Sequence, residues 1–183
     1  MFDNDKGVDR RIRRTRDRLG DALIELLKEK GFDAFTVQDV LDRAQVARST
    51  FYAHYRGKDD LFLSDLEEFF EAMGSFIERS RERSRRVMAV RELFSHIADS
   101  RKLYDAMVVS GRIDDYFALA QGCFARGIEA RLRVLAPDAD EPRLRATALS
   151  GALLSLLRQW LQRAKEHSAE EMDAFFHSLV WPW

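Results

Sequence analysis

Apolar residues recur along most of the chain at the three- and four-residue spacing of amphipathic helices. The first clear stripe runs from Leu19 to Leu27 and is followed by Gly31, a residue type that often ends helices. Later stripes predict helices at about 59–86, 88–99, 101–109, 113–135, 141–166 and 169–179. Because no segment alternates apolar and polar residues with period two, the sequence predicts an all-α fold of about nine helices.

Two short helices are predicted between the first stripe and the long segment that starts at residue 59. Thr36, followed three residues later by Asp39, has the pattern of a capping box, so a helix should begin at residue 37. Ser168, with Glu171 three residues later, is a candidate N-cap of the last predicted helix. A turn at 45–47 separates the helix that begins at residue 37 from a second short helix at about 48–55, which Gly57 would end. Short helices joined by a tight turn are typical of a helix-turn-helix, whose second helix enters the DNA major groove.

Positive charge is concentrated around this predicted motif. Residues 6–18 hold seven basic residues and two acidic ones, and residues 43–58 hold four basic residues and no acid, in a chain of net charge −1. Localised positive charge in an otherwise acidic chain favours contact with a polyanion such as DNA. A basic tail that is only solvated, with no bound polyanion, would show the same excess of basic residues.

The composition of the chain argues against several other classes of protein. The single cysteine, Cys123, excludes an internal disulfide framework and a multi-cysteine metal site. No apolar run approaches the roughly 20 residues of a membrane helix, and the N-terminal residues do not have the pattern of a secretory signal. We therefore expect a soluble, cytoplasmic protein with no cofactor or metal. The absence of common catalytic motifs, and of metal-ligand spacing among the four histidines, argues against an enzyme.

The stretch GFDAFTVQDVLDRAQVARSTFYAHYRGKDDLF, residues 31–62, resembles the DNA-binding domain of the tetracycline-repressor (TetR) family of bacterial regulators. With the helix before it, the resemblance covers residues 14–62. It implies an arm and helix-turn-helix domain at 1–58 and a helical ligand-binding and dimerisation domain at 59–183. Gln45 departs from the family pattern, which usually has glycine here. This position often takes a positive φ, at a cost of about 1 kcal/mol for other residues.

The resemblance also implies which residues contact DNA. Arg48 is the first choice for a bidentate contact to guanine, while Tyr52 and Lys58 would contact phosphates and Thr36 would offer its hydroxyl and amide to another. Tyr52 could instead be a half-buried aromatic residue, and His54 could pack at the end of the helix rather than contact DNA. The expected DNA contacts are Thr36, Arg48, Ser49, Thr50, Tyr52, His54 and Lys58.

The helices after residue 59 suggest two further sites. Aromatic, methionine and polar residues could line an apolar ligand pocket, or could be plain core. The helices at 141–166 and 169–179 are apolar on several faces, so they should pair with a second copy, although an intramolecular core would look the same. The pocket candidates are Phe70, Met73, Phe76, Phe94, His96, Tyr104, Met107, Phe117, Gln121 and Phe124. The dimer candidates are Ala148, Gly151, Ala152, Ser155, Trp160, Phe175 and Phe176.

These features together predict a DNA-binding transcriptional regulator. It would bind a palindromic operator as a homodimer, act as a repressor and be released by a small, largely apolar ligand. The acidic C-terminal part argues mildly against an anionic effector. The alternative is a helical protein-interaction module whose helix-turn-helix no longer binds DNA, which Gln45 alone favours.

Overall fold

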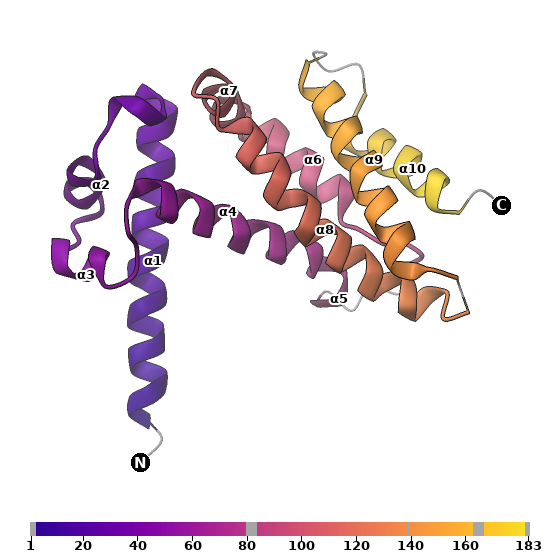
Figure 1. Cartoon of the computed structure of the whole chain (residues 1–183), viewed down its shortest axis with the longest axis horizontal. Coiled ribbons are helices and arrows are strands. Elements are labelled where there is room, and N and C mark those ends of the chain that lie inside the picture. The colour runs from indigo at the N-terminus through magenta and orange to yellow at the C-terminus, as the bar shows by residue number, and fades with distance from the viewer. Residues whose placement is uncertain (1–2, 80–83, 139, 163–166, 182–183) are drawn as a thin grey trace. The chain divides into compact units, whose positions relative to one another are not determined.

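The computed structural model describes residues 3–79, 84–138, 140–162 and 167–181, with the side chains of 3–9 and 78–79 excepted. Every regular element in these residues is a helix (Figure 1), which confirms the all-α prediction. Within the described ranges nine helices have five residues or more, and α5 is a single turn of four. The elements are α1 (Asp3–Lys30), the 3₁₀ turn η1 (Phe32–Ala34), α2 (Val37–Ala44), α3 (Arg48–Tyr52), α4 (Lys58–Gly74), α5 (Phe76–Arg79), α6 (Val90–Asp99), α7 (Arg101–Val109), α8 (Ile113–Leu135), α9 (Pro142–Gln162) and α10 (Ala169–Val180).

The chain divides into two compact units. Unit 1 contains the residues up to Asp65 together with Lys102–Ile113, and unit 2 contains Leu66–Arg101 and the residues from Asp114 onward. Most of α7 therefore packs with the N-terminal helices, although it lies far from them in sequence. The helix α4 begins in unit 1 and ends in unit 2, so it is a continuous element of both.

Unit 1 is built on the apolar face of α1. Leu19, Leu23 and Leu27 on this face are fully buried, and α2 packs along α1 while α3 packs against α2 (Figure 1). Phe32 and Phe51 are also fully buried. The helix begins at Asp3, so the basic segment that was expected to precede it as an arm is itself helical.

Capping boxes begin two of the helices, as predicted from the sequence. At α2, the Asp39 amide donates to the Thr36 hydroxyl oxygen over 3.3 Å, and the Asp39 carboxylate accepts from the Thr36 amide over 2.7 Å. At α10, Ser168 and Glu171 make the same reciprocal pair. Each box satisfies amides that the first turn of a helix would otherwise leave without partners.

The turn between α2 and α3 contains the left-handed residue that the sequence predicts. Gln45 has φ 51° and ψ 48°, and the Val46 amide donates to the Leu41 carbonyl over 3.1 Å. This bond closes a Schellman motif, in which the left-handed position is usually glycine. The turn thus keeps the geometry that a glycine would give, with a glutamine in the strained position.

The predicted single helix over 59–86 is wrong in its second half. The helix α4 ends at Gly74, the four-residue α5 follows, residues 80–83 lie outside the described part, and 84–89 form no helix. A Cβ added at Gly127 of α8 would lie 2.6 Å from the Gly74 carbonyl oxygen. The backbones of α4 and α8 therefore touch at the last residue of α4, where glycine also weakens the helix.

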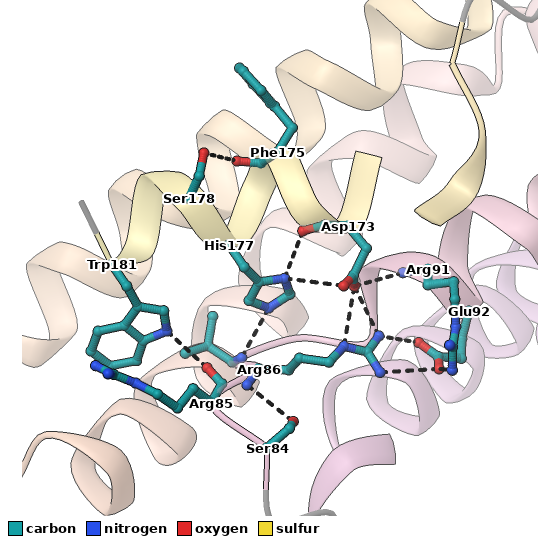
Figure 2. Close-up of polar contacts among 11 residues, drawn as sticks. Ser84, Arg85, Arg86, Arg91, Glu92, Asp173, Phe175, His177, Ser178 and Trp181 are labelled. Carbon is teal, nitrogen blue, oxygen red and sulfur yellow. Dashed lines mark hydrogen bonds and ion pairs between the residues drawn. The ribbon is translucent and has the colours of Figure 1, made fainter. Parts of the chain in front are cut away.

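The segment just before α6, residues 84–89, is held by polar contacts with α6 and α10. Arg86 has a side chain only 15% exposed, and its Nη2 lies 2.5 Å from Glu92 Oε2 and 2.9 Å from Asp173 Oδ1 of α10 (Figure 2). The Val87 amide donates to His177 Nε2 over 3.1 Å. These bonds fasten the segment to α10, which also packs along α6.

Candidate nucleic-acid interface

The short helix α3 has one buried and one exposed face. Phe51 is fully buried and its ring lies 5.6 Å from that of Tyr55. Arg48 and Ser49 are exposed, and Thr50 is half-buried. The helix ends at Tyr52 rather than near residue 55, and His54 follows it as an exposed turn residue. The side chains that were predicted to read DNA therefore lie on the outer face of α3 and its following turn.

Arg48 and Tyr52 form a stacked pair on this outer face. The Arg48 guanidinium carbon lies 5.3 Å from the centre of the Tyr52 ring, which is within the range of a cation–π interaction. Tyr52 is 47% exposed, so the ring that supports the guanidinium lies at the surface. A guanidinium held in this way presents planar donors that can bridge two acceptors of one base.

Lys58, expected to contact a phosphate, has protein partners in this structure. Its ammonium donates to the carbonyl oxygens of Phe32 and Phe35, over 2.7 and 2.8 Å, and lies 4.6 and 4.9 Å from the centres of their rings. An ammonium has three donors, so these two bonds leave one for another acceptor. The first residue of α4 thus holds the connection between α1 and α2 in place.

Thr36 is also engaged within the protein. Its hydroxyl and its amide each lie 2.7 Å from Asp39 Oδ2. The hydrogen bond from the Thr36 hydroxyl, followed by that from the Thr36 amide, lowers the pKa of Asp39 below its ordinary value. A carboxylate therefore already occupies the position at the start of α2 where a phosphate was expected, and a phosphate would have to displace it.

Arg112, also in unit 1, was not predicted from the sequence as a site residue. Its Nη2 lies 2.5 Å from Asp59 Oδ1 in the first turn of α4, and its guanidinium carbon lies 4.1 Å from the centre of the Phe32 ring. Arg112 stands just before α8, far along the chain from both partners. No local spacing rule relates residues so distant in sequence, which is why pattern analysis missed it.

Most of the predicted ligand-pocket residues pack in the protein core. The rings of Phe70 and Phe124 lie 5.3 Å apart and are fully buried. Tyr104 and Met107 are buried in unit 1, whereas the other candidates belong to unit 2. His96 is exposed and stacks on Phe69 at 4.6 Å. The remaining core or half-buried candidates are Met73, Phe76 and Phe94.

Two pocket candidates lie at a groove between α8 and α9. Phe117 and Gln121 line this groove, which has a volume of about 440 Å³. Arg158 lies 4.4 Å from the centre of the Phe117 ring, and the Gln121 amide donates to Ser150 Oγ over 2.8 Å. The other lining residues are Ala118, Gly151, Leu154, Ser155 and Arg158. Gly151 and Ser155, predicted at a dimer interface, thus border this groove.

The predicted dimer residues divide between the surface and the interior. Phe176 is fully buried within unit 2, so its side chain is not available to a partner and that assignment is corrected. Trp160, another dimer candidate, lies edge-to-face against Phe94 with the ring centres 5.2 Å apart, and it donates its indole N–H to the His167 carbonyl over 3.0 Å. The candidates that remain accessible are Ala148, Ser155 and Phe175, which are exposed, and Gly151 and Ala152, which are half-buried.

An exposed apolar surface does lie on α9 and α10. Phe175 is 52% exposed and Leu179 is 46% exposed. Beside Phe175 is a mostly apolar cavity of about 320 Å³. Its lining residues are Leu156, Gln159, Trp160, His167, Glu171, Met172 and Phe175. We call Ala148, Ala152, Phe175 and Leu179 together the α9–α10 face.

The described helices include none that is long and apolar enough to cross a membrane.

Residues 19–64 match the family described as bacterial regulatory proteins, tetR family. The chain is 26% identical over 189 residues to the HTH-type transcriptional regulator TcmR of Streptomyces glaucescens, covering 93% of this chain and 83% of that protein. It is 37% identical over 60 residues to the uncharacterized HTH-type transcriptional regulator YxbF of Bacillus subtilis, covering 32% of this chain and only 16% of YxbF.

A crystal structure of a TetR transcriptional regulator from Streptococcus agalactiae has a similar fold. Its TM-score is 0.64 at 24% identity, and the superposition covers 96% of this chain and 98% of that one. At this identity the likeness shows the fold alone. The match at 19–64 covers η1, α2, α3 and the start of α4, the elements that form the candidate interface. Residues 19–64 therefore form a domain of the tetR family of bacterial regulatory proteins.

Proposed function

We propose that this regulator binds a palindromic DNA operator as a homodimer, represses transcription, and is released by a small, largely apolar ligand. The observation that carries the DNA part is the exposed pair of Arg48 and Tyr52 on α3. A cation on the outer face of a short recognition helix is suited to base edges in the major groove. Repression and release by a ligand rest on the family resemblance.

The turn before α3 argues against the alternative of an interaction module without DNA binding. Gln45 was the feature that favoured that alternative. The turn nevertheless closes as a Schellman motif through the Val46 amide and the Leu41 carbonyl. Because the backbone path keeps its usual form, the replacement of glycine gives no reason for α3 to lose its function.

The homodimer is supported by the α9–α10 face. A helix-turn-helix reads one half-site, so two copies must be held about 34–36 Å apart to reach successive major-groove faces. Phe175 projects from α10 beside an apolar cavity on the same face. In a two-fold dimer each copy contributes the same surface, so a projecting ring and an adjacent cavity can meet their counterparts.

For the ligand, the groove between α8 and α9 has more support than the buried core. Phe117 and Leu154 provide apolar contacts, and Gln121 provides an amide, around a volume of about 440 Å³. This volume falls within the range of small-molecule sites, which combine apolar walls with few polar groups. Phe70 and Phe124, in contrast, are packed ring against ring.

Selection from a pool of random duplexes tests the proposed DNA binding. The full chain should enrich a two-fold symmetric sequence whose half-sites are centred about one helical turn apart. Its affinity should fall steeply between about 50 and 200 mM salt, as for any protein that neutralises phosphates. Failure to enrich any sequence, together with no salt-dependent binding, would overturn the proposal.

A further inference from the structure

The ring of Phe32 in η1 is contacted by two cations that lie far apart in the sequence. Lys58 Nζ lies 4.6 Å from its centre and the Arg112 guanidinium carbon lies 4.1 Å from it. Arg112 also pairs with Asp59, the residue next to Lys58. Three segments, namely η1, the first turn of α4 and the loop after α7, are therefore joined at a single point.

The backbone of Arg112 is fixed by the way α7 ends. Gly111 has φ 69°, and the Arg112 amide donates to the Met107 carbonyl over 2.8 Å. This pair forms a left-handed helix end of the Schellman type. Met107 itself is fully buried. The guanidinium therefore extends from a rigid position, which distinguishes Arg112 from a surface arginine that finds a carboxylate by chance.

Arg112 also offsets negative charge in the first turn of α4. Asp59 and Asp60 stand in the first turn of α4, immediately after the lysine that would approach a phosphate. Two carboxylates at this place repel a DNA backbone unless they are paired. The Asp60 carboxylate accepts from the Arg56 amide over 2.9 Å, and the Asp59 carboxylate is paired with Arg112.

We propose that Arg112 is a positioning residue for the DNA interface, and this inference rests on the proposed DNA-binding function. It holds the first turn of α4 against η1 and offsets the charge of Asp59, without touching DNA itself. Arg112 immediately precedes α8 in the chain.

Two substitutions at Arg112 separate its positive charge from the geometry of its guanidinium. Arg112→Ala removes the ion pair and the contact with Phe32, and it should weaken binding to the selected duplex about fivefold, the combined scale of one partly exposed ion pair and one cation–π contact. Arg112→Lys keeps the charge and should lose less. The matched control is Arg133→Ala, which removes an exposed ion pair with Glu129 on α8 and should leave binding unchanged.

Salt dependence distinguishes positioning from direct contact. Loss of a phosphate contact reduces the slope of log K against log salt by about 0.9, whereas loss of a positioning residue leaves the slope unchanged. The expected result for Arg112→Ala is therefore weaker binding at an unchanged slope. A slope reduced by about 0.9 would show that Arg112 contacts DNA, and an unchanged affinity would show that it does nothing for the interface. Either result overturns the inference.

Amide hydrogen exchange tests the same inference without DNA. In Arg112→Ala, exchange should rise in η1 and in the first turn of α4 while unit 2 keeps its protection. The charge swap Asp59→Arg with Arg112→Asp should restore protection relative to either single change. Unchanged exchange, or faster exchange throughout the chain, overturns the inference. If the wild-type chain selects no duplex, the proposed function fails, and the exchange result still decides whether Arg112 holds these segments.

Discussion

Arg18 of α1 donates a hydrogen bond from Nη2 to the carbonyl oxygen of Gln45 over 3.2 Å. Gln45 is the residue in the left-handed conformation between α2 and α3. The bond ties the strained turn to the first helix of the unit. The acceptor is the backbone carbonyl of Gln45, so the bond does not depend on the glutamine side chain.

Replacing Gln45 with glycine should stabilise the protein, because glycine adopts a positive φ without steric cost. We expect Gln45→Gly to raise the free energy of unfolding by about 0.5–1 kcal/mol, measured as a higher urea midpoint at an unchanged slope. The matched control is Gln38→Gly, the same change on the exposed side of α2, which should lower stability by about 1 kcal/mol. A loss of stability in Gln45→Gly would mean that the glutamine side chain stabilises the turn.

Replacing Lys58 with alanine should lower stability as well as DNA affinity. The carbonyls of Phe32 and Phe35 would lose their charged donor, at a cost of about 1–2 kcal/mol. Affinity should fall by the same factor for the selected duplex and for random DNA, because a phosphate contact carries no sequence information. Thermal unfolding and fluorescence anisotropy measure the two effects, with the exposed Lys102→Ala as control. Unchanged stability would contradict the structural role of Lys58.

Asp173 should make stability depend on pH in the acid range. Burial raises the pKa of Asp173, but the hydrogen bonds from His177 and from the Arg91 amide, with the charge of Arg86, outweigh it, so the pKa lies below its ordinary value of 3.8. A lowered folded-state pKa contributes stability that is present above about pH 4 and is lost as pH falls through the folded value. Asp173→Asn should therefore cost about 1–3 kcal/mol at pH 7.

The test of this effect is a comparison of urea unfolding at pH 7 and at pH values below 4. The difference between wild type and Asp173→Asn should shrink as the wild-type carboxyl becomes protonated. Asp138→Asn, which changes an exposed carboxylate, serves as control. A difference that stayed constant over this range would show that the network around Arg86 depends on shape and not on the charge of Asp173.

The α9–α10 face should control the oligomeric state. We expect Phe175→Glu to raise the dimer dissociation constant at least about tenfold, because it places a charge in an apolar contact that excludes water. The fold should be unaffected, since this side chain is 52% exposed in the single chain. Val134→Glu, at an exposed residue of α8, is the control. Sedimentation that showed Phe175→Glu still dimeric would place the interface elsewhere.

Local signals in the sequence predicted the helices and two of their caps. The stripe of α1, the capping boxes at Thr36 and Ser168, and the positive φ of Gln45 all depend on neighbours within a few residues. The break after Gly74 could not be predicted in this way, because the apolar stripe continues through Phe76. The close approach of Gly127 on α8 is visible only once the helices are packed.

In the candidate sites, too, local features could be predicted from the sequence and long-range contacts could not. The outward face of α3 followed from its spacing, but the partners of Lys58 and Arg86 did not, since most of them lie far away in sequence. On α10, Phe175 and Phe176 are adjacent and chemically identical, yet one is exposed and the other buried. A helix with apolar residues on several faces does not indicate which one turns inward, so the pattern alone could not separate interface from core.

The affinity of Arg48→Ala for two duplexes decides whether α3 reads DNA through Arg48. One is the sequence that the wild-type chain selects, and the other carries a changed base pair at one position of each half-site. We expect Arg48→Ala to lose about 1–3 kcal/mol of discrimination at that single position, while its affinity for random DNA changes little. Equal losses of affinity on the selected and random duplexes would show instead that Arg48 contacts only the phosphate backbone.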